Sequence, residues 1–193
     1  MALLIAALHL PRRWSLALAL VLHALTTTAA SAQTASAPSL RAAFLFNFAK
    51  FTEWPADALP PATPLVICVL GDPAAAAALQ QSARNQTVGG HRIVVRKGLD
   101  EGPVQSCHVL YVATAVELQV RTLLDSVKGA PVLTVGESAF FAADGGSVQL
   151  FRENDRMRFA VNIDAVQGQK LRLSAQLLNL AKLVRSNKDA PHD

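Results

Sequence analysis

Two cysteines, Cys68 and Cys107, are the residues of this chain with the clearest chemical potential. Two thiols can form a disulfide, bind a metal ion or supply a nucleophile. A metal site needs more ligands, and His108 is the only obvious further one. A nucleophile needs an activating group, but adjacent residues on a strand, such as Cys107 and His108, point to opposite faces. In an exported protein the pair therefore predicts a disulfide, Cys68–Cys107.

Two carboxylates, Asp72 and Glu137, follow apolar runs that predict strands. Open α/β sheets bind ligands at the carboxyl ends of their strands, so both residues are candidates for a ligand cleft. Each also has a simpler role. Asp72 can cap a helix that Pro73 begins, and Glu137 can stabilise the start of a helical turn. The sequence leaves both interpretations open.

Five further residues are candidates for binding a protein partner. Arg152, Arg156 and Arg158 cluster on a predicted hairpin. They can form a solvated edge that discourages strand pairing, or they can bind acidic groups. Phe46 and Trp54 lie off the main apolar face of an aromatic-rich helix, and exposed aromatic residues favour interfaces.

Motifs of the common enzyme classes are absent from the sequence. It contains no G-x-G-x-x-G, no phosphate-binding loop, no G-x-S-x-G and no H-E-x-x-H. No serine, cysteine or carboxylate stands beside a base in a recognisable pattern. We therefore expect no catalytic site, no cofactor and no metal site.

The N-terminal part of the chain predicts export. Arg12 and Arg13 precede an apolar run over 14–25, and Ala30-Ser31-Ala32 fits a cleavage site, which predicts a signal peptide over 1–32. A flexible leader is expected over 33–40, one folded domain over 41–186 and a polar tail over 187–193. Removing two arginines from 18 basic and 14 acidic residues leaves a charge of +2, which gives no support for nucleic-acid binding.

The order of apolar runs predicts an α/β fold. The continuous apolar run at 65–70 fits a strand that is covered on both faces, and 107–113 is predicted to be a second buried strand. Further strands are predicted at 91–97, around Ile93-Val94-Val95, and at 131–135. Helices are predicted at 41–53, 73–83 and 114–125. This order is typical of a doubly wound sheet. We predict one domain with a mostly parallel central sheet flanked by helices.

The C-terminal part departs from that alternation. Residues 147–151 and 156–162 flank a turn and predict an antiparallel hairpin on the sheet edge. A final amphipathic helix is expected to start at Ser174, with Leu177, Leu178, Ala181 and Val184 on its apolar face.

Several short blocks follow one another along the chain. They are AAFLFNFAKFTEWP at 42–55, LVICVLGD at 65–72, CHVLYV at 107–112, VLTVGE at 132–137, RFAVN at 158–162 and LRLSAQLLNLA at 171–181. In order and content these blocks resemble the YfiR family of bacterial periplasmic proteins. Some family members carry a second cysteine pair near the strand that here starts at Ser147, and this chain does not.

The resemblance implies a periplasmic α/β domain without catalysis. It implies a regulator that represses an inner-membrane diguanylate cyclase through the periplasmic region of that enzyme, and an outer-membrane-linked protein that sequesters the regulator. A homodimer is compatible with it, and membrane insertion after signal removal is not expected. The alternative is a periplasmic protein that binds a small ligand in the strand-end cleft near Asp72 and Glu137.

Overall fold

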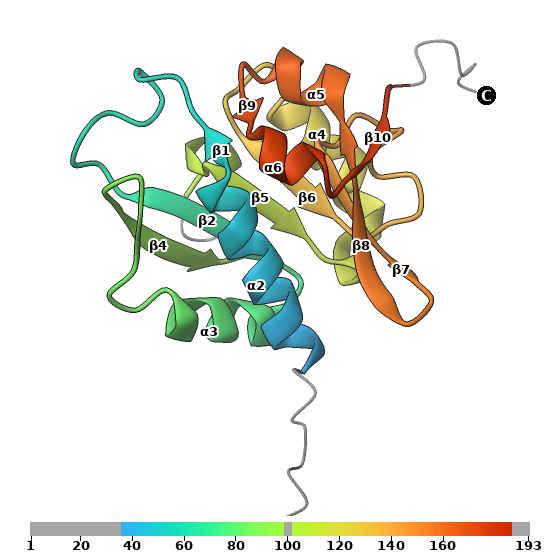
Figure 1. Ribbon diagram of the computed structural model, residues 1–193, viewed down its shortest axis with the longest axis horizontal. Helices are drawn as coiled ribbons and strands as arrows, with labels where there is room; N and C mark the ends of the chain where they lie inside the picture. Colours follow the sequence, from blue (N-terminus) through green and yellow to red (C-terminus); the bar gives the residue numbers. More distant parts are fainter. Residues whose placement is uncertain (1–35, 99–101, 187–193) are drawn as a thin grey trace, which may run out of the picture. The chain divides into compact units, whose positions relative to one another are not determined.

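An eight-stranded sheet forms the centre of residues 36–98 and 102–186, the part of the chain that the computed structural model describes (Figure 1). The strand order is β10-β8-β7-β6-β5-β2-β4-β3. The strands are β2 Leu65–Leu70, β3 Thr87–Val88, β4 His91–Lys97, β5 Val109–Val112, β6 Leu133–Gly136, β7 Val148–Glu153, β8 Arg156–Asn162 and β10 Lys182–Val184.

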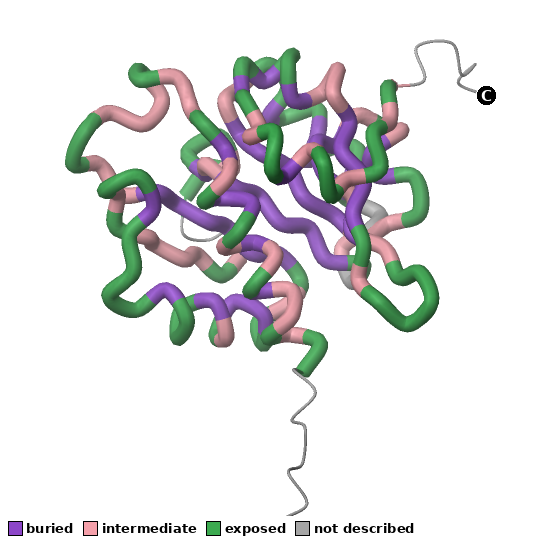
Figure 2. Tube along the Cα trace, viewed as in Figure 1, coloured by how far each residue is buried: buried purple, intermediate pink, exposed green. Residues whose placement is uncertain are grey.

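The sheet is mostly parallel, as predicted. Strands β4, β2, β5, β6 and β7 run in the same direction, whereas β8 returns antiparallel to β7. Every residue of β2, β5 and β6 is buried. Figure 2 shows these central strands as the most deeply buried part of the trace. Their continuous apolar sequences fit a sheet that is covered on both faces.

Helices cover the two faces of the sheet. The core of one face includes residues of α2 (Ala37–Lys50), α3 (Pro73–Ser82), α5 (Ile163–Gly168) and α6 (Ala175–Leu178). The core of the other face includes residues of α4 (Val120–Ser126). The short 3-10 segments are η1 Val104–Ser106 and η2 Thr114–Gln119. A separate antiparallel pair joins β1 (Thr52–Glu53) to β9 (Arg172–Leu173).

The aromatic-rich helix differs from its predicted bounds at both ends. Helix α2 begins at Ala37, and the Ser36 side chain caps it by accepting from the Ser39 N–H. Residues 37–40 are therefore helical, not part of a flexible leader. The sequence feature that indicates the earlier start is Ser36, a favourable capping residue, followed by Pro38 in the first turn of the helix. The helix ends at Lys50, because Thr52 and Glu53 pair with β9.

The predicted final helix is wrong beyond its first turn. Ser174 caps α6 as expected, but α6 ends at Leu178. The chain then forms β10, which pairs in parallel with Ala160–Asn162 of β8. The β7–β8 hairpin is confirmed, but β10 rather than the hairpin lies at this edge of the sheet. The apolar residues of 177–184 fit the spacing of a helix and of a strand alike. Hydrogen bonding to the edge of β8 favours the strand at 182–184.

The predicted disulfide is present. Cys68 of β2 and Cys107, two residues before the start of β5, are bonded with their Cα atoms 5.9 Å apart. Both cysteines are buried on the α4 face. Because β2 and β5 are neighbours, the bond connects adjacent segments of one sheet across 39 residues of chain. Within the described residues, no helix is long and apolar enough to cross a membrane.

Candidate functional site at the carboxyl edge of the sheet

The carboxyl ends of β2, β5 and β6 meet at one edge of the sheet, and a cluster of charged side chains lies there. Arg41 reaches this edge from α2 and binds Glu137 with two hydrogen bonds, Nε to Oε1 at 2.5 Å and Nη2 to Oε2 at 3.0 Å. The Tyr111 hydroxyl donates to the same Oε1 at 2.6 Å. Asp72 Oδ2 lies 3.6 Å from Arg41 Nη1. We call these four residues the carboxyl-edge cluster.

Close packing fixes the position of Glu137. The Phe141 ring lies against the backbone of Gly136 and Gly146, and a Cβ atom at either glycine would overlap the ring. Phe141 is fully buried, so it holds the turn after β6 in one conformation. Glu137 therefore leaves the end of β6 in a direction that brings its carboxylate to Arg41.

The cluster fixes the charge of its members. Its hydrogen bond with Glu137 raises the pKa of Arg41. Burial alone would raise the pKa of Glu137, but the hydrogen bonds from Arg41 and Tyr111 outweigh burial, so this pKa is lowered. Burial, together with the bond to Glu137, raises the pKa of Tyr111. At neutral pH the cluster therefore holds an ion pair and a neutral phenol.

Asp72 and Glu137, the two residues of the predicted ligand cleft, both belong to the carboxyl-edge cluster and lie close to Arg41. Asp72 also caps α3, because its Oδ1 accepts from the Ala75 N–H at 2.8 Å. Glu137 accepts three hydrogen bonds, two from Arg41 and one from Tyr111. The sequence indicated that both carboxylates lie at one edge of the sheet, but the pairing of Arg41 with them was not predicted. One feature of the sequence could have indicated it. Arg41 stands at the expected start of a helix, where the helix dipole disfavours a cation, so a nearby carboxylate was to be expected.

The two aromatic candidates for partner binding, Phe46 and Trp54, are half-buried. Both pack against the core of the α2 face. Trp54 also packs edge to face on His108, with ring centroids 6.0 Å apart. Its buried Nε1 has no hydrogen-bond partner among the described residues. Both residues therefore contribute to packing, and their role in partner binding stays a prediction.

His108 links the beginning of the sheet to the loop after β1. The Val66 N–H donates to its Nδ1 at 3.0 Å, so the proton of the neutral ring is on Nε2, which donates to Ala58 O at 3.2 Å. Burial lowers the pKa of His108, although the bond to Ala58 opposes this. Protonation of Nδ1 would remove the acceptor of the Val66 N–H.

The hairpin arginines, in contrast, are exposed. Arg152 lies 3.6 Å from Asp155 and Arg158 lies 3.9 Å from Glu153, and all four side chains are at least half exposed. Such pairs hold the guanidinium groups weakly. Arg152, Arg156 and Arg158 therefore remain accessible to an acidic partner.

One exposed aromatic residue was not predicted. Phe140 is 74% exposed, in the turn that leaves the carboxyl end of β6. Strands β6 and β7 are parallel, so this turn and the β7–β8 hairpin lie at the same edge of the sheet. No spacing pattern in the sequence distinguishes Phe140 from the buried Phe141. The hairpin register places Arg152 with Met157 on one face and Arg156 and Arg158 on the other. We call Phe140 and the three hairpin arginines the hairpin surface, which therefore includes both faces of the hairpin end.

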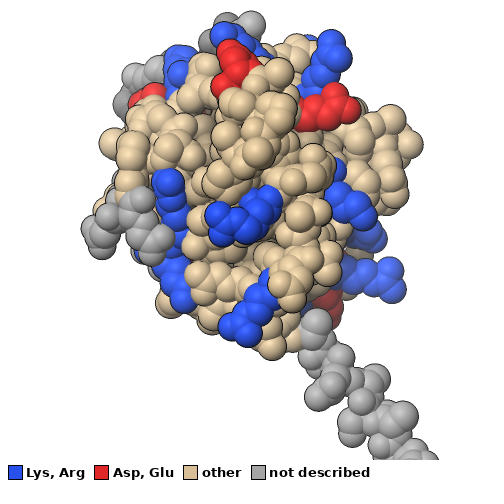
Figure 3. Space-filling view, turned by 90° about the vertical axis from the view of Figure 1, so that its left-hand side faces the viewer, with Lys and Arg blue, Asp and Glu red and all other residues tan. Residues whose placement is uncertain are grey.

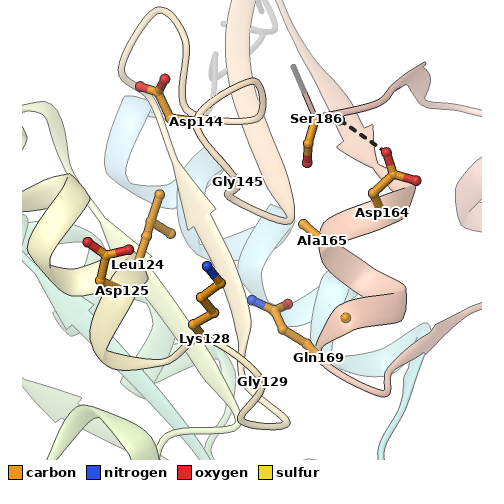
Figure 4. A pocket seen from close by; sticks show the side chains of 11 residues that line it. Leu124, Asp125, Lys128, Gly129, Asp144, Gly145, Asp164, Ala165, Gln169 and Ser186 are labelled. Atoms are coloured by element: carbon orange, nitrogen blue, oxygen red, sulfur yellow. Dashed lines mark hydrogen bonds between the residues drawn. The ribbon is translucent and has the colours of Figure 1, made fainter. Parts of the chain in front are cut away.

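A separate cavity of about 600 Å³ lies away from this edge (Figure 4). Its lining includes Asp125 of α4, Lys128 after α4, Asp144, and Gln169 after α5. Within the described residues, no group of three or more His, Cys, Asp or Glu is placed to hold a metal ion. The sequence analysis did not predict this cavity, because its residues come from segments far apart in the chain.

The fold and the carboxyl-edge cluster define an α/β domain that is cross-linked by a disulfide and whose strand-end carboxylates pair with an arginine of the same domain. The model of the YfiR/HmsC-like family matches residues 38–182, so the chain belongs to this family, which is known for periplasmic regulators of diguanylate cyclases.

Comparison with solved structures and curated proteins adds little. A solved conserved domain protein from Vibrio cholerae O1 biovar El Tor strain N16961 is 15% identical, with a TM-score of 0.48. The match covers 77% of this chain and 60% of that protein. No curated protein sequence matches the chain.

Proposed function

We propose that this chain is a non-enzymatic periplasmic regulator that binds the periplasmic region of an inner-membrane diguanylate cyclase and represses it. The observation that carries the proposal is family membership over residues 38–182, which span nearly the whole described domain. The Cys68–Cys107 bond supports it, since structural disulfides persist in oxidising compartments such as the periplasm. Repression would lower cyclic di-GMP, and an outer-membrane-linked protein would relieve it by sequestering the regulator.

The hairpin surface is the partner-binding site that we favour. Arginine and aromatic residues are enriched among the residues that dominate binding energy at interfaces. Arg152, Arg156 and Arg158 have at most weak, exposed ion pairs, and Phe140 is largely exposed. The guanidinium groups would bind carboxylates of the partner, and Phe140 would fill an apolar pocket beside them.

A genetic experiment tests this proposal. Deletion of the gene should raise cyclic di-GMP and biofilm, and the wild-type gene should restore both. A triple variant, Arg152→Glu, Arg156→Glu and Arg158→Glu, should reach wild-type levels in the periplasm but fail to repress. The matched control is Arg121→Glu, an exposed arginine on α4. An unchanged nucleotide level after deletion, in a strain with a cognate cyclase, would contradict the proposed function.

A second function, small-ligand binding, is favoured by one side chain in the cavity of Figure 4. Gln169 is 5% exposed, and the Ser147 hydroxyl donates to its Oε1. Among the described residues, the only acceptor for the Thr134 hydroxyl is Ser147 Oγ, so Thr134 donates to Ser147 and Ser147 donates onward. Among residues 36–98 and 102–186, Gln169 Nε2 has no hydrogen-bond partner, and the side chain lines the cavity.

The cavity suits a small ligand that carries a carboxylate. Gln169 Nε2 and the Lys128 ammonium line the same cavity and would both donate to its oxygens. Acetate is a simple probe. We expect it to shift the NMR signals of the cavity residues, and Lys128→Gln should lose most of the shifts. Shifts that persist unchanged in Lys128→Gln would contradict this function.

A further inference from the structure

The sheet has a partly open edge at β4, opposite the edge that β10 covers. Strand β3 pairs only with His91 and Arg92 of β4. Among the described residues, no strand pairs with the outer side of β4 from Val94 to Lys97. Unpaired strand edges of this kind are templates on which another chain can add a strand.

The ladder between β2 and β4 shows which backbone groups of β4 point away from β2. The Gly98 N–H donates to Val69 O, and Val69 is in register with Lys97. In a parallel ladder with this register, Val94 and Arg96 direct their N–H and C=O groups to β2, whereas Val95 and Lys97 direct theirs outward. The Gln80 side chain confirms this orientation, since its Nε2 donates to Val95 O at 3.4 Å. A strand added at this edge would displace that exposed side chain from Val95 O.

A groove lies directly beside this edge. It has a volume of about 580 Å³, and its lining comes from the end of α3, the turn after it and residues 92–95 of β4. Ile93 and Val95 are only partly buried. A strand added to β4 would bond to Val95 and Lys97 and lay alternate side chains into this groove.

The positive charge around the β4 edge favours an added strand that carries acidic side chains. Between Pro73 and Gly98 the sequence contains Arg84, Arg92, Arg96 and Lys97 and no acidic residue. Among the described residues, none of these four cations forms an ion pair. Figure 3 views the molecule from the side of β4 and α3, and Lys and Arg predominate on that face.

We propose that the open edge of β4 binds an extended acidic segment of a partner protein by strand addition. A second copy of this chain fits less well, because two β4 edges side by side would bring like charges together. The binding site is inferred from the β4 edge alone. Only the identity of the partner rests on the proposed function, which would place the acidic segment in the regulated membrane protein or in the protein that sequesters the regulator.

A peptide-binding experiment tests the inference. The probe is a short synthetic peptide of alternating glutamate and threonine, titrated into the isotope-labelled periplasmic form at low salt. We expect saturable shifts centred on the amides of Val95 and Lys97. A peptide with lysine in place of glutamate, and one with alternate backbone amides methylated, should each bind at least about tenfold more weakly.

Protein variants separate backbone pairing from charge. The Val95 N–H points outward, so Val95→Pro should leave the β2–β4 ladder intact and weaken peptide binding about tenfold. Val94→Pro removes an N–H from the ladder and should lower the melting temperature instead. The pair Arg84→Glu, Arg92→Glu should also abolish peptide binding, whereas Arg121→Glu on the other face should not.

Three results would overturn the inference. They are equal binding of the lysine and glutamate peptides, wild-type binding by a folded Val95→Pro variant, and a dimer of the wild type that Val95→Pro dissociates. The methylated peptide keeps the test valid if Val95→Pro does not fold. Peptide binding with unchanged cyclic di-GMP after gene deletion would refute only the proposed function. Raised cyclic di-GMP without peptide binding would refute only the strand-addition site.

Discussion

Replacing Glu137 by glutamine should destabilise the folded domain by removing the charge at the centre of the carboxyl-edge cluster. The glutamine keeps the shape of the side chain and an acceptor for Tyr111. It loses the ion pair with Arg41, whose side chain is 25% exposed against 14% for Glu137. Arg41 would retain only the longer approach to Asp72, at 3.6 Å.

The magnitude follows from these contacts. A hydrogen bond that involves a charged group contributes about 1.5–3 kcal/mol, and an unpaired half-buried charge adds a desolvation cost. We expect Glu137→Gln to lower the free energy of unfolding by about 2–3 kcal/mol. For a domain of this size that corresponds to a melting temperature about 5–10 °C lower. The matched control, Glu153→Gln, breaks an exposed pair at 3.9 Å and should cost less than about 0.5 kcal/mol.

The loss should depend on pH in one direction. The pKa of Glu137 is lowered in the folded state, so its stabilising effect is present above the ordinary glutamate value of 4.5. It disappears as the pH falls through the lowered folded-state pKa. Denaturant unfolding at pH 7 and at successively lower pH, by circular dichroism, measures the difference between wild type and variant. A difference below about 0.5 kcal/mol at pH 7, equal to that of the control, would refute the structural role of the cluster.

Three other changes have defined outcomes. The double variant Cys68→Ser, Cys107→Ser removes a cross-link across 39 residues, and its free energy of unfolding should be lower by up to about 4 kcal/mol. Reductant should lower the melting temperature of the wild type only. Two free thiols in periplasmic protein would contradict the bond. Because burial lowers the pKa of His108, the free energy of unfolding of the wild type should decrease as the pH falls below 6.5. In denaturant titrations at pH 7.5 and pH 5, His108→Gln should show a smaller decrease. Equal decreases in the two proteins would contradict a neutral His108 ring. Trp54→Ala should lower the melting temperature because the side chain packs on His108, and weaker repression at unchanged stability would instead make Trp54 a partner contact.

The central fold could be predicted because its strands are short, continuous apolar runs with clear ends. Leu65–Leu70 is bounded by Pro64 and Gly71, and the structure buries every residue of it. The Asp72 cap and the hairpin were equally visible, since a capping side chain before proline and a polar turn between alternating strands are local signals.

The rest depended on contacts between distant segments. Residues 182–184 form a strand only because β8 presents a free edge, which a local helical pattern cannot reveal. Arg41 and Glu137 meet across 96 residues of chain, so their pairing has no local signal. For the same reason the ion pair between Arg41 and Glu137 at the strand-end edge could not be predicted from the sequence.

The most direct test of the proposed function is a binding titration between two purified proteins. The periplasmic form of this chain would be titrated calorimetrically with the periplasmic region of each membrane diguanylate cyclase from the same organism. We predict saturable binding to one of them, weakened by salt and by the triple arginine-to-glutamate hairpin variant, and unaffected by Arg121→Glu. Absence of binding to every such region, with folded proteins on both sides, would contradict the account.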